Sequence, residues 1–293
     1  MAAVAQPAPR AIPTAAFRSS AVVPYVLLAL WTVPIVLLYV FLFYSSFFPR
    51  IEGFTPVGGF TVENWRFLWD PLSVPQMRNR PPIIPLTINT FIFAAMTSSV
   101  GLLVSSMAGY AFSRLRFRGR RVFLSGVLLL HSFPSVTLLI ATFVVLRTLG
   151  LYDKLVGVIL VQTAFALPFG IWIMKGFFDN IPWDLEMSAL VDGAGRLRTW
   201  WRIMLPLVKP GLLALAVLLF VEGWNQFLLP FVFMPSGSQQ TLSTLVRGIL
   251  GEGRFVDYGL LTAVGLYYIA PVLVLFILAQ DQLMRIYAGG VKG

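Results

Sequence analysis

Long apolar runs dominate this sequence and limit what it can fold into. Six of them lie at about 22–48, 83–112, 122–146, 155–177, 211–234 and 258–284. Backbone polar groups inside a bilayer must bond to one another, so an apolar run of about 18 residues or more predicts a membrane-spanning helix. The composition agrees, because 58% of the residues are hydrophobic and only 12% are charged. The sequence therefore predicts an all-α polytopic membrane protein with six transmembrane helices.

Positive charge is distributed unevenly among the segments that join these runs. With six spans both termini lie on one side, and the segments on that side carry 14 of the 22 Lys and Arg residues. Five arginines are packed into SRLRFRGRR at 113–121. Because cytoplasmic loops are enriched in Lys and Arg, this bias predicts cytoplasmic termini and an outer position for 49–82. Topology and attraction to membrane lipid explain the basic excess, so no nucleic-acid partner is predicted.

The chain divides into one membrane domain and two tails. Residues 1–20 are rich in Ala and Pro and predict a disordered cytoplasmic tail, followed by the membrane domain at 21–284 and a cytoplasmic tail at 285–293. The chain has no cysteine and one histidine, so we expect no disulfide and no metal site. It also has no Gly-Lys pair, which a phosphate-binding P-loop requires. We therefore expect a chain that is not an enzyme and does not hydrolyse ATP.

A charged segment at about 178–210 separates two of the apolar runs. Acidic residues favour a helix start, and Asp184 and Glu186 accompany a predicted helix from about Trp183 to Val191. Met187, Leu190 and Val191 form its apolar stripe. Two glycines, Gly193 and Gly195, then permit a left-handed turn before a second helical piece that ends near Pro206. The pattern predicts a helix–turn–helix that contacts another protein. Contact with lipid is the alternative, but lipid-surface helices are usually basic.

This segment resembles the EAA loop of the permease subunits of binding-protein-dependent ABC importers. That pattern reads Glu-Ala-Ala, three residues, Gly, nine residues, Ile, one residue, Leu-Pro. Ala189, Gly193, Ile203, Leu205 and Pro206 fall in register with it. Other stretches, among them NTFIFAAMTSSVGLLVSSMAGYAFSRLRFRGR, VEGWNQFLLP and AGGVKG, are similar to the carbohydrate branch of the family, in particular to the second permease of maltose-type importers. The resemblance covers roughly 60–293, with the transmembrane core at about 87–281.

The resemblance implies a type I ABC importer permease fold in a bacterial or archaeal cell (inner) membrane. It implies a sugar substrate, a second homologous permease, two ATPase subunits and an extracytoplasmic solute-binding protein. ATP and Mg would be bound by the ATPase subunits, and no cofactor by this chain. Two alternatives stay open, namely a stand-alone secondary carrier and an ABC permease for a non-sugar solute such as a glycerol phosphate.

The resemblance also implies that the loop at 182–206 is the coupling helix, which fits a cleft of the ATPase. The residues that it assigns to this coupling are Asp184, Glu186, Met187, Ser188, Ala189, Leu190, Asp192, Gly193, Arg196, Leu205 and Pro206. Met187 stands where relatives have the Glu of EAA, and Ser188 stands where they have its first Ala. The ion pair that this Glu is implied to make with the ATPase therefore lacks its acidic partner here.

Polar residues inside the apolar runs suggest a solute path. The candidates are Glu222, Trp224, Asn225, Gln226, Gln162 and His131. Glu222, Asn225 and Gln226 are spaced to share one face of a helix, and polar groups at this depth rarely face lipid. They either bond neighbouring helices together or meet sugar hydroxyls, while the Trp224 ring stacks on a pyranose. Pro134 predicts a kink in the third run.

Three aromatic residues mark the outer segment 49–82. Trp65, Phe67 and Trp69 either anchor the chain at the lipid headgroups or dock the outer solute receptor.

Overall fold

The computed structural model describes residues 22–71, 82–237, 239–250 and 256–289. The predicted tail at 1–20 lies outside these residues. The longer helices are α2 (Val22–Ser45), α3 (Ile83–Arg114), α4 (Arg120–His131), α5 (Leu139–Thr148), α6 (Leu155–Asp179), α10 (Lys209–Asn225) and α13 (Tyr258–Gly289). The shorter elements are β1 (Arg50–Glu52), β2 (Thr55–Val57), η1 (Glu63–Leu68), η2 (Ser135–Leu138), α7 (Trp183–Val191), α8 (Arg196–Thr199), η3 (Trp200–Met204), α9 (Leu205–Leu207), α11 (Leu228–Phe233) and α12 (Leu242–Leu250).

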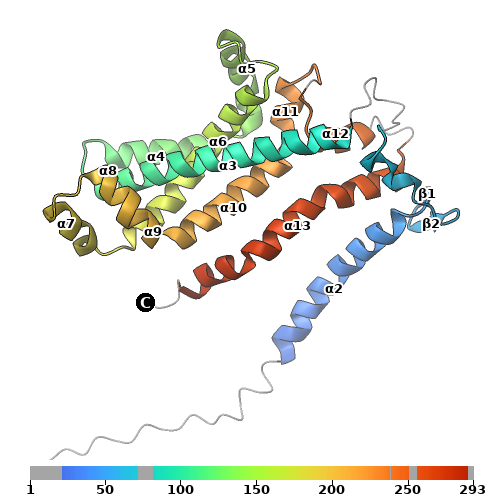
Figure 1. Ribbon diagram of the computed structural model, residues 1–293, viewed down its shortest axis with the longest axis horizontal. Coiled ribbons are helices and arrows are strands. Elements are labelled where there is room, and N and C mark those ends of the chain that lie inside the picture. The colour runs from blue at the N-terminus through green and yellow to red at the C-terminus, as the bar shows by residue number, and fades with distance from the viewer. Residues whose placement is uncertain (1–21, 72–81, 238, 251–255, 290–293) are drawn as a thin grey trace, which may run out of the picture.

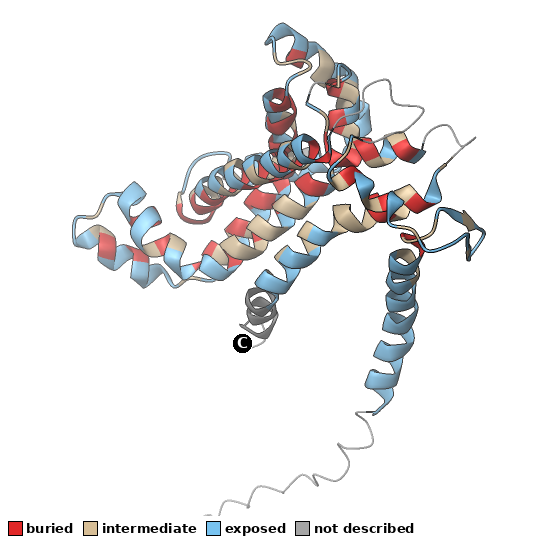
Figure 2. Ribbon diagram, turned by 45° about the vertical axis from the view of Figure 1, so that its right-hand side comes forward, coloured by how far each residue is buried: buried red, intermediate tan, exposed pale blue. Residues whose placement is uncertain are grey.

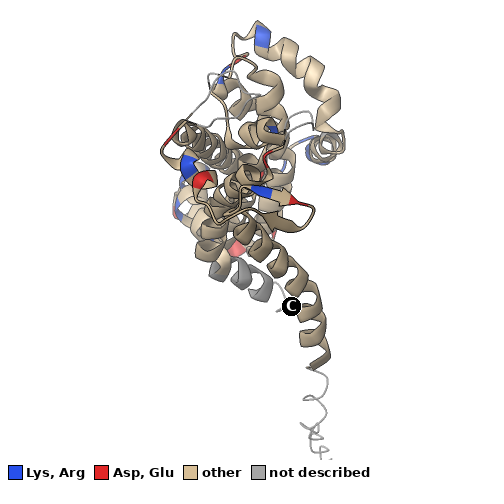
Figure 3. Cartoon of the chain, turned by 90° about the vertical axis from the view of Figure 1, so that its right-hand side faces the viewer, with Lys and Arg blue, Asp and Glu red and all other residues tan. Residues whose placement is uncertain are grey.

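Four helices in the described part of the chain are long and apolar enough to cross a membrane. They are α2, α3, α6 and the Tyr258–Gln280 part of α13. A fifth candidate is broken, because Arg196–Leu207 and Lys209–Asn225 pass the same test together but meet at an angle of 83°. The all-α membrane character is therefore confirmed, whereas six uninterrupted spans are not. Most of the helical ribbon carries no charged residue (Figure 3).

The third apolar run, 122–146, does not form one helix. Helix α4 ends at His131, and helical structure resumes only at η2 and α5. Pro134 lies in the break with an extended backbone (φ −57°, ψ 129°), and proline can neither donate to the preceding turn nor fit inside it. The predicted kink at Pro134 is thus a complete interruption. The fifth run is also divided, because α10 ends at Asn225 and Gln226 adopts an extended conformation before α11.

Helices α3, α6 and α10 form the centre of the molecule, and α13 lies beside α10 (Figure 1). A row of small residues spaced four apart lets α3 approach its neighbours, and its members are Thr97, Gly101, Ser105, Gly109 and Ser113, all buried. A Cβ at Gly109 would lie 2.7 Å from Met174 Cβ, and one at Gly170 would lie 2.3 Å from Ser105 Oγ. Small residues permit close packing between membrane helices, and here they join α3 to α6.

Helix α2 contrasts with this centre. In its most apolar window no residue is buried, and its packing within the chain is mainly against α13 (Figure 2). It ends next to the short antiparallel pair β1–β2, whose register is Arg50 opposite Val57. At the other end of the chain α13 continues to Gly289, so the C-terminal segment predicted as a tail from 285 begins within a helix.

Candidate functional site

The charged segment forms the predicted helix–turn–helix. Helix α7 covers Trp183–Val191, and Pro182 directly precedes it with an extended backbone (φ −56°, ψ 139°). The turn after it depends on Gly193, whose φ of +84° lies in the left-handed region that side chains disfavour. Gly195, with φ −66° and ψ 153°, is extended and does not contribute a left-handed residue. The helix bounds are therefore confirmed, and the turn uses one of the two predicted glycines.

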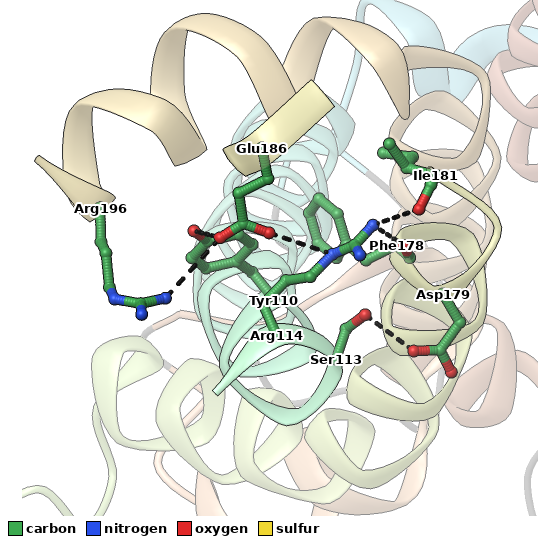
Figure 4. A network of polar contacts seen from close by, with 8 residues as sticks. All are labelled: Tyr110, Ser113, Arg114, Phe178, Asp179, Ile181, Glu186 and Arg196. Atoms are coloured by element: carbon green, nitrogen blue, oxygen red, sulfur yellow. Dashed lines mark hydrogen bonds and ion pairs between the residues drawn. The ribbon is translucent and has the colours of Figure 1, made fainter. Parts of the chain in front are cut away.

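Glu186 does not point outward, although the sequence placed it among the residues that touch the ATPase. Its side chain is 0% exposed. Tyr110 donates its hydroxyl to Glu186 Oε1 at 2.6 Å, and Arg114 Nε lies 3.3 Å from Glu186 Oε2. We call Tyr110, Arg114 and Glu186 the anchor (Figure 4). Arg196, at the start of α8, approaches Glu186 Oε1 more loosely at 3.7 Å, with its own side chain 54% exposed.

Arg114 connects three helices. Its Nη2 donates to the carbonyl oxygens of Phe178 at 2.7 Å and Ile181 at 2.6 Å, next to the end of α6. Carbonyls at a helix end lack a partner within the helix, so the guanidinium satisfies them. The guanidinium carbon also lies 4.8 Å from the ring centre of Trp183, the first residue of α7. Arg114 therefore joins the end of α3 to both α6 and α7.

The sequence reading missed Tyr110 and Arg114. Arg114 was counted only as one of five arginines that set the topology. The signal that could have distinguished Arg114 from the other four arginines is its spacing from Tyr110, because residues four apart share one face of a helix. A second contact, from Ser113 Oγ to Asp179 Oδ1 at 2.7 Å, also joins the ends of α3 and α6 (Figure 4).

The outward face of α7 carries apolar side chains. Val191 is 86% exposed, Leu185 is 47% exposed and Met187 is 37% exposed. Leu190 is partly exposed beside Met187 and Val191, so the three residues of the predicted apolar stripe all reach the surface. Glu186 and Ala189 are buried and take the inward face of the helix. Asp184, Ser188 and Asp192 are exposed around this apolar face.

The second limb of the segment leads from this turn back to the membrane helices. It consists of α8, the π-helical turn η3 and α9, which contains Leu205 and Pro206. Trp200 and Met204 are buried and hold η3 against the core. The chain then bends by 83° into α10. Arg196 of this limb loosely approaches Glu186 of α7, and each limb also has its own attachment to the core, through Trp200 and Met204 or through the anchor.

A second polar cluster lies between α6 and α10. Gln162 donates its Nε2 to Glu222 Oε1 at 2.8 Å, and Gln226 donates its Nε2 to Gln162 Oε1 at 2.7 Å. We call Gln162, Glu222 and Gln226 the amide chain. Gln162 is buried, whereas Glu222 is exposed on the surface of this chain. His131 stacks on Phe169 with the ring centres 6.1 Å apart, so it packs against α6, the helix that carries Gln162.

Trp224 lies away from the exposed edge of the amide chain. It is 1% exposed and donates its Nε1 to the carbonyl oxygen of Tyr268 at 3.1 Å. The expected stacking of Trp224 on a solute is therefore wrong, because Phe220 and Tyr268 already cover its ring. Asn225 is exposed, and the single proton of the Tyr268 hydroxyl is shared between the Trp224 carbonyl oxygen at 2.9 Å and Asn225 Oδ1 at 3.2 Å.

The outer aromatic residues also differ from one another. Phe67 is 4% exposed and belongs to the core, so it is not available for docking. Trp65 donates its Nε1 to Ser46 Oγ at 3.2 Å. Trp69 is 66% exposed and remains the candidate for an outer contact. In the described ranges no three His, Cys, Asp or Glu residues lie close enough to hold a metal ion.

Comparison with known proteins decides the family. Residues 101–283 match the binding-protein-dependent transport system inner membrane component family. The chain belongs to this family. The permease is 32% identical, over 70% of its length and 76% of the relative's, to the trehalose transport system permease protein SugB of Mycobacterium tuberculosis. It is also 32% identical to the sulfoquinovosyl glycerol transport system permease protein SmoH of Agrobacterium fabrum, over 72% and 74% of the two chains.

A solved structure supports the fold of the permease. One chain of a bacterial ABC transporter involved in the import of the acidic polysaccharide alginate superposes with a TM-score of 0.76 at 22% identity. The match covers 93% of the permease and 99% of that chain. This superposition confirms the permease fold, and the family match confirms the inner-membrane location.

Proposed function

We propose that the permease is a transmembrane subunit of an ATP-driven sugar importer and passes the motion of an ATPase to the membrane helices through α7. The observation that carries this proposal is the combination of an exposed apolar face on α7 with a buried ionic attachment behind it. A helix that transmits motion from another subunit needs both a contact surface for that subunit and a rigid attachment to the membrane helices. The carbohydrate substrates in the names of SugB and SmoH support a sugar as the solute.

The remaining subunits follow from the family. A second, related permease, two ATPase subunits and an extracytoplasmic solute-binding protein would complete the importer. ATP and Mg bind to the ATPase subunits, and this permease contributes no catalytic residue. Driven closure of the ATPase pair displaces α7 and changes which side of the membrane the path opens to, which is rigid-body gating by a ligand with different affinity for two states.

The exposed edge of the amide chain is the proposed solute path. A carboxylate that faced lipid would be costly, so the exposed side of Glu222 requires water, solute or the second permease. Carboxylate and amide groups are suited to hydrogen bonding with sugar hydroxyls. Asn225 is exposed three residues after Glu222 in α10, on the same side of that helix. Gln162 holds Glu222 and Gln226 in place from α6.

The coupling role is tested at Val191. Burying a side chain of this size stabilises an interface by roughly 1.5–3 kcal/mol, and burying an unpaired charge costs more. Val191→Asp should therefore weaken ATPase docking at least about tenfold, while the nearly isosteric Val191→Thr should have a much smaller effect. Val191 is 86% exposed, so neither variant should unfold the permease. Docking and stimulated ATP hydrolysis are measured in the reconstituted importer. Full docking by Val191→Asp would remove α7 from the coupling interface.

The orientation is tested by labelling. The permease contains no cysteine, so single cysteines can be introduced without a background signal. Gly119 and Gly58 both have a positive φ, and the predicted topology places them on opposite sides of the membrane. An impermeant thiol reagent added to intact cells should label Gly58→Cys and not Gly119→Cys. The reverse pattern would place the arginine loop and α7 outside and exclude coupling to a cytoplasmic ATPase.

A further inference from the structure

The arginine run at 114–121 divides into one buried residue and a basic pocket. Arg114 is buried in the anchor and does not line this pocket. The other four arginines line a pocket of about 550 Å³ together with Phe117, Gly119 and Val122, where α3 has ended and α4 begins. Within the described residues, Arg116, Arg118 and Arg121 have no ion pair with an acidic side chain. Four arginines therefore line the pocket, and three of them have no acidic partner among the described residues.

An apolar groove adjoins this pocket. It has a volume of about 410 Å³ and lies between α4 and α6, and its lining residues include Leu124, Leu128, Trp172, Gly176 and Phe177. The two spaces are neighbours along α4, which contributes Val122 to the pocket and Leu124 to the groove. Asp179 is the one acid among the residues that line either space, and Lys175 and Ser113 already engage it. It therefore does not oppose binding of an anion.

We infer that this pocket and groove form a binding site for an anionic glycerophospholipid of the surrounding leaflet. The arginines would hold the phosphodiester, because guanidinium groups match phosphate oxygens in charge and geometry. An acyl chain would lie in the groove between α4 and α6. Basic pockets between membrane helices bind anionic headgroups in this way. Val122, 76% exposed, and Phe123, 63% exposed, continue the apolar surface toward lipid. The proposal does not depend on coupling through α7.

The first test removes the charge. The full-length permease, purified with its partner subunits, is equilibrated with phosphatidylcholine vesicles that contain a minor fraction of phosphatidylglycerol, and the lipid retained after repurification is quantified by mass spectrometry. The variant R116Q/R118Q/R121Q leaves the anchor intact. The control R198Q/R202Q/K209Q removes the same charge from exposed positions outside the pocket. A basic residue near an anionic surface contributes about a fivefold factor in affinity. The pocket variant should lose at least about tenfold in phosphatidylglycerol enrichment, and the control much less.

The second test fills the groove without changing charge. No atom lies within 4 Å of a Cβ built at Gly176, which lines the groove, or at Gly126, which does not. Gly176→Leu should therefore reduce retained phosphatidylglycerol severalfold, whereas Gly126→Leu should leave it unchanged. Soluble glycerol phosphate and inorganic phosphate, added as competitors, should displace little lipid because they lack the acyl contact.

Three outcomes would overturn the proposal. Equal loss in the pocket variant and in its charge-matched control would show general attraction to the membrane surface. Full retention of lipid by R116Q/R118Q/R121Q together with loss of the ATPase subunits would identify an acidic protein surface as the occupant. Displacement by inorganic phosphate, with no effect of Gly176→Leu, would identify a free-phosphate site.

Discussion

Two polar clusters lie inside this apolar permease, and they are built differently. The anchor pairs a carboxylate with a guanidinium, and both side chains are buried (0% exposed for Glu186 and 1% for Arg114). The amide chain contains one carboxylate, two amides and no cation within hydrogen-bonding distance, and Glu222 keeps an exposed side. A closed, charge-balanced cluster can hold helices together but has no surface left for a ligand. An open cluster with spare acceptors can bind one.

The largest expected contrast comes from the same substitution at the two carboxylates. Glu186→Gln leaves Arg114 buried without its counter-charge, and removing one partner of a buried ion pair costs about 3–5 kcal/mol. Glu222→Gln keeps an oxygen that accepts from Gln162 and loses a charge that is partly exposed, so it should cost less than about 0.5 kcal/mol. Thermal unfolding of the purified permease measures both.

A second variant separates charge from packing at the anchor. The double substitution Arg114→Gln with Glu186→Gln removes both charges, so it should recover part of the stability that Glu186→Gln loses. Tyr110→Phe removes only the 2.6 Å hydrogen bond to Glu186 and should cost about 1–3 kcal/mol because it leaves a buried acceptor unsatisfied. Equal stability of Glu186→Gln and Glu222→Gln would show that the anchor does not support α7.

An intermediate effect is expected at the turn that holds α7 on this anchor. Gly193 has a φ of +84°, whereas Gly195 has a φ of −66°, and a Cβ built at either has no atom within 4 Å. The two glycines therefore differ in backbone conformation alone. Gly193→Val should cost about 1–3 kcal/mol and reduce receptor-stimulated ATP hydrolysis, while Gly195→Val should be close to neutral. Similar behaviour of the two variants would mean that the left-handed turn does not fix the limbs.

The two clusters also differ in how well the sequence predicted them. The bounds of α7 were predictable because its start, its glycine turn and its spacing are local signals. The anchor was not, because Tyr110 and Glu186 are 76 residues apart and only the packing of α3 on α6 brings them together. The direction of Glu186 depends on that packing, so the acid that was expected at the ATPase contact is instead buried behind the apolar stripe of Met187, Leu190 and Val191.

The breaks in the apolar runs likewise depend on contacts between helices that are distant in the sequence, so local sequence signals did not predict them. Hydrophobicity predicted that 122–146 enters the membrane, but it contains no information on whether neighbouring helices keep the segment continuous. Pro134 signalled a kink, and the chain instead leaves the helix between His131 and Ser135. In the fifth run the polar residues were predicted to share a face. The end of α10 at Asn225 divides them, so Gln226 turns to Gln162 while Asn225 turns to Tyr268.

The smallest expected effect concerns solute at the open cluster. Asn225 is exposed at the edge of the amide chain, and a hydrogen bond to a solute hydroxyl would contribute about 0.5–1.5 kcal/mol. Asn225→Leu should therefore raise the KM for transport about two- to tenfold without changing assembly. Tyr268→Phe removes the hydroxyl that lies 2.9 Å from the Trp224 carbonyl oxygen and 3.2 Å from Asn225 Oδ1 but keeps the Asn225 amide, so its KM should rise less. Transport by reconstituted vesicles and the yield of assembled complex are measured together. If Asn225→Leu lost assembly and kept KM, the amide chain would belong with the anchor as a contact between helices, and the contrast between the two clusters would fail.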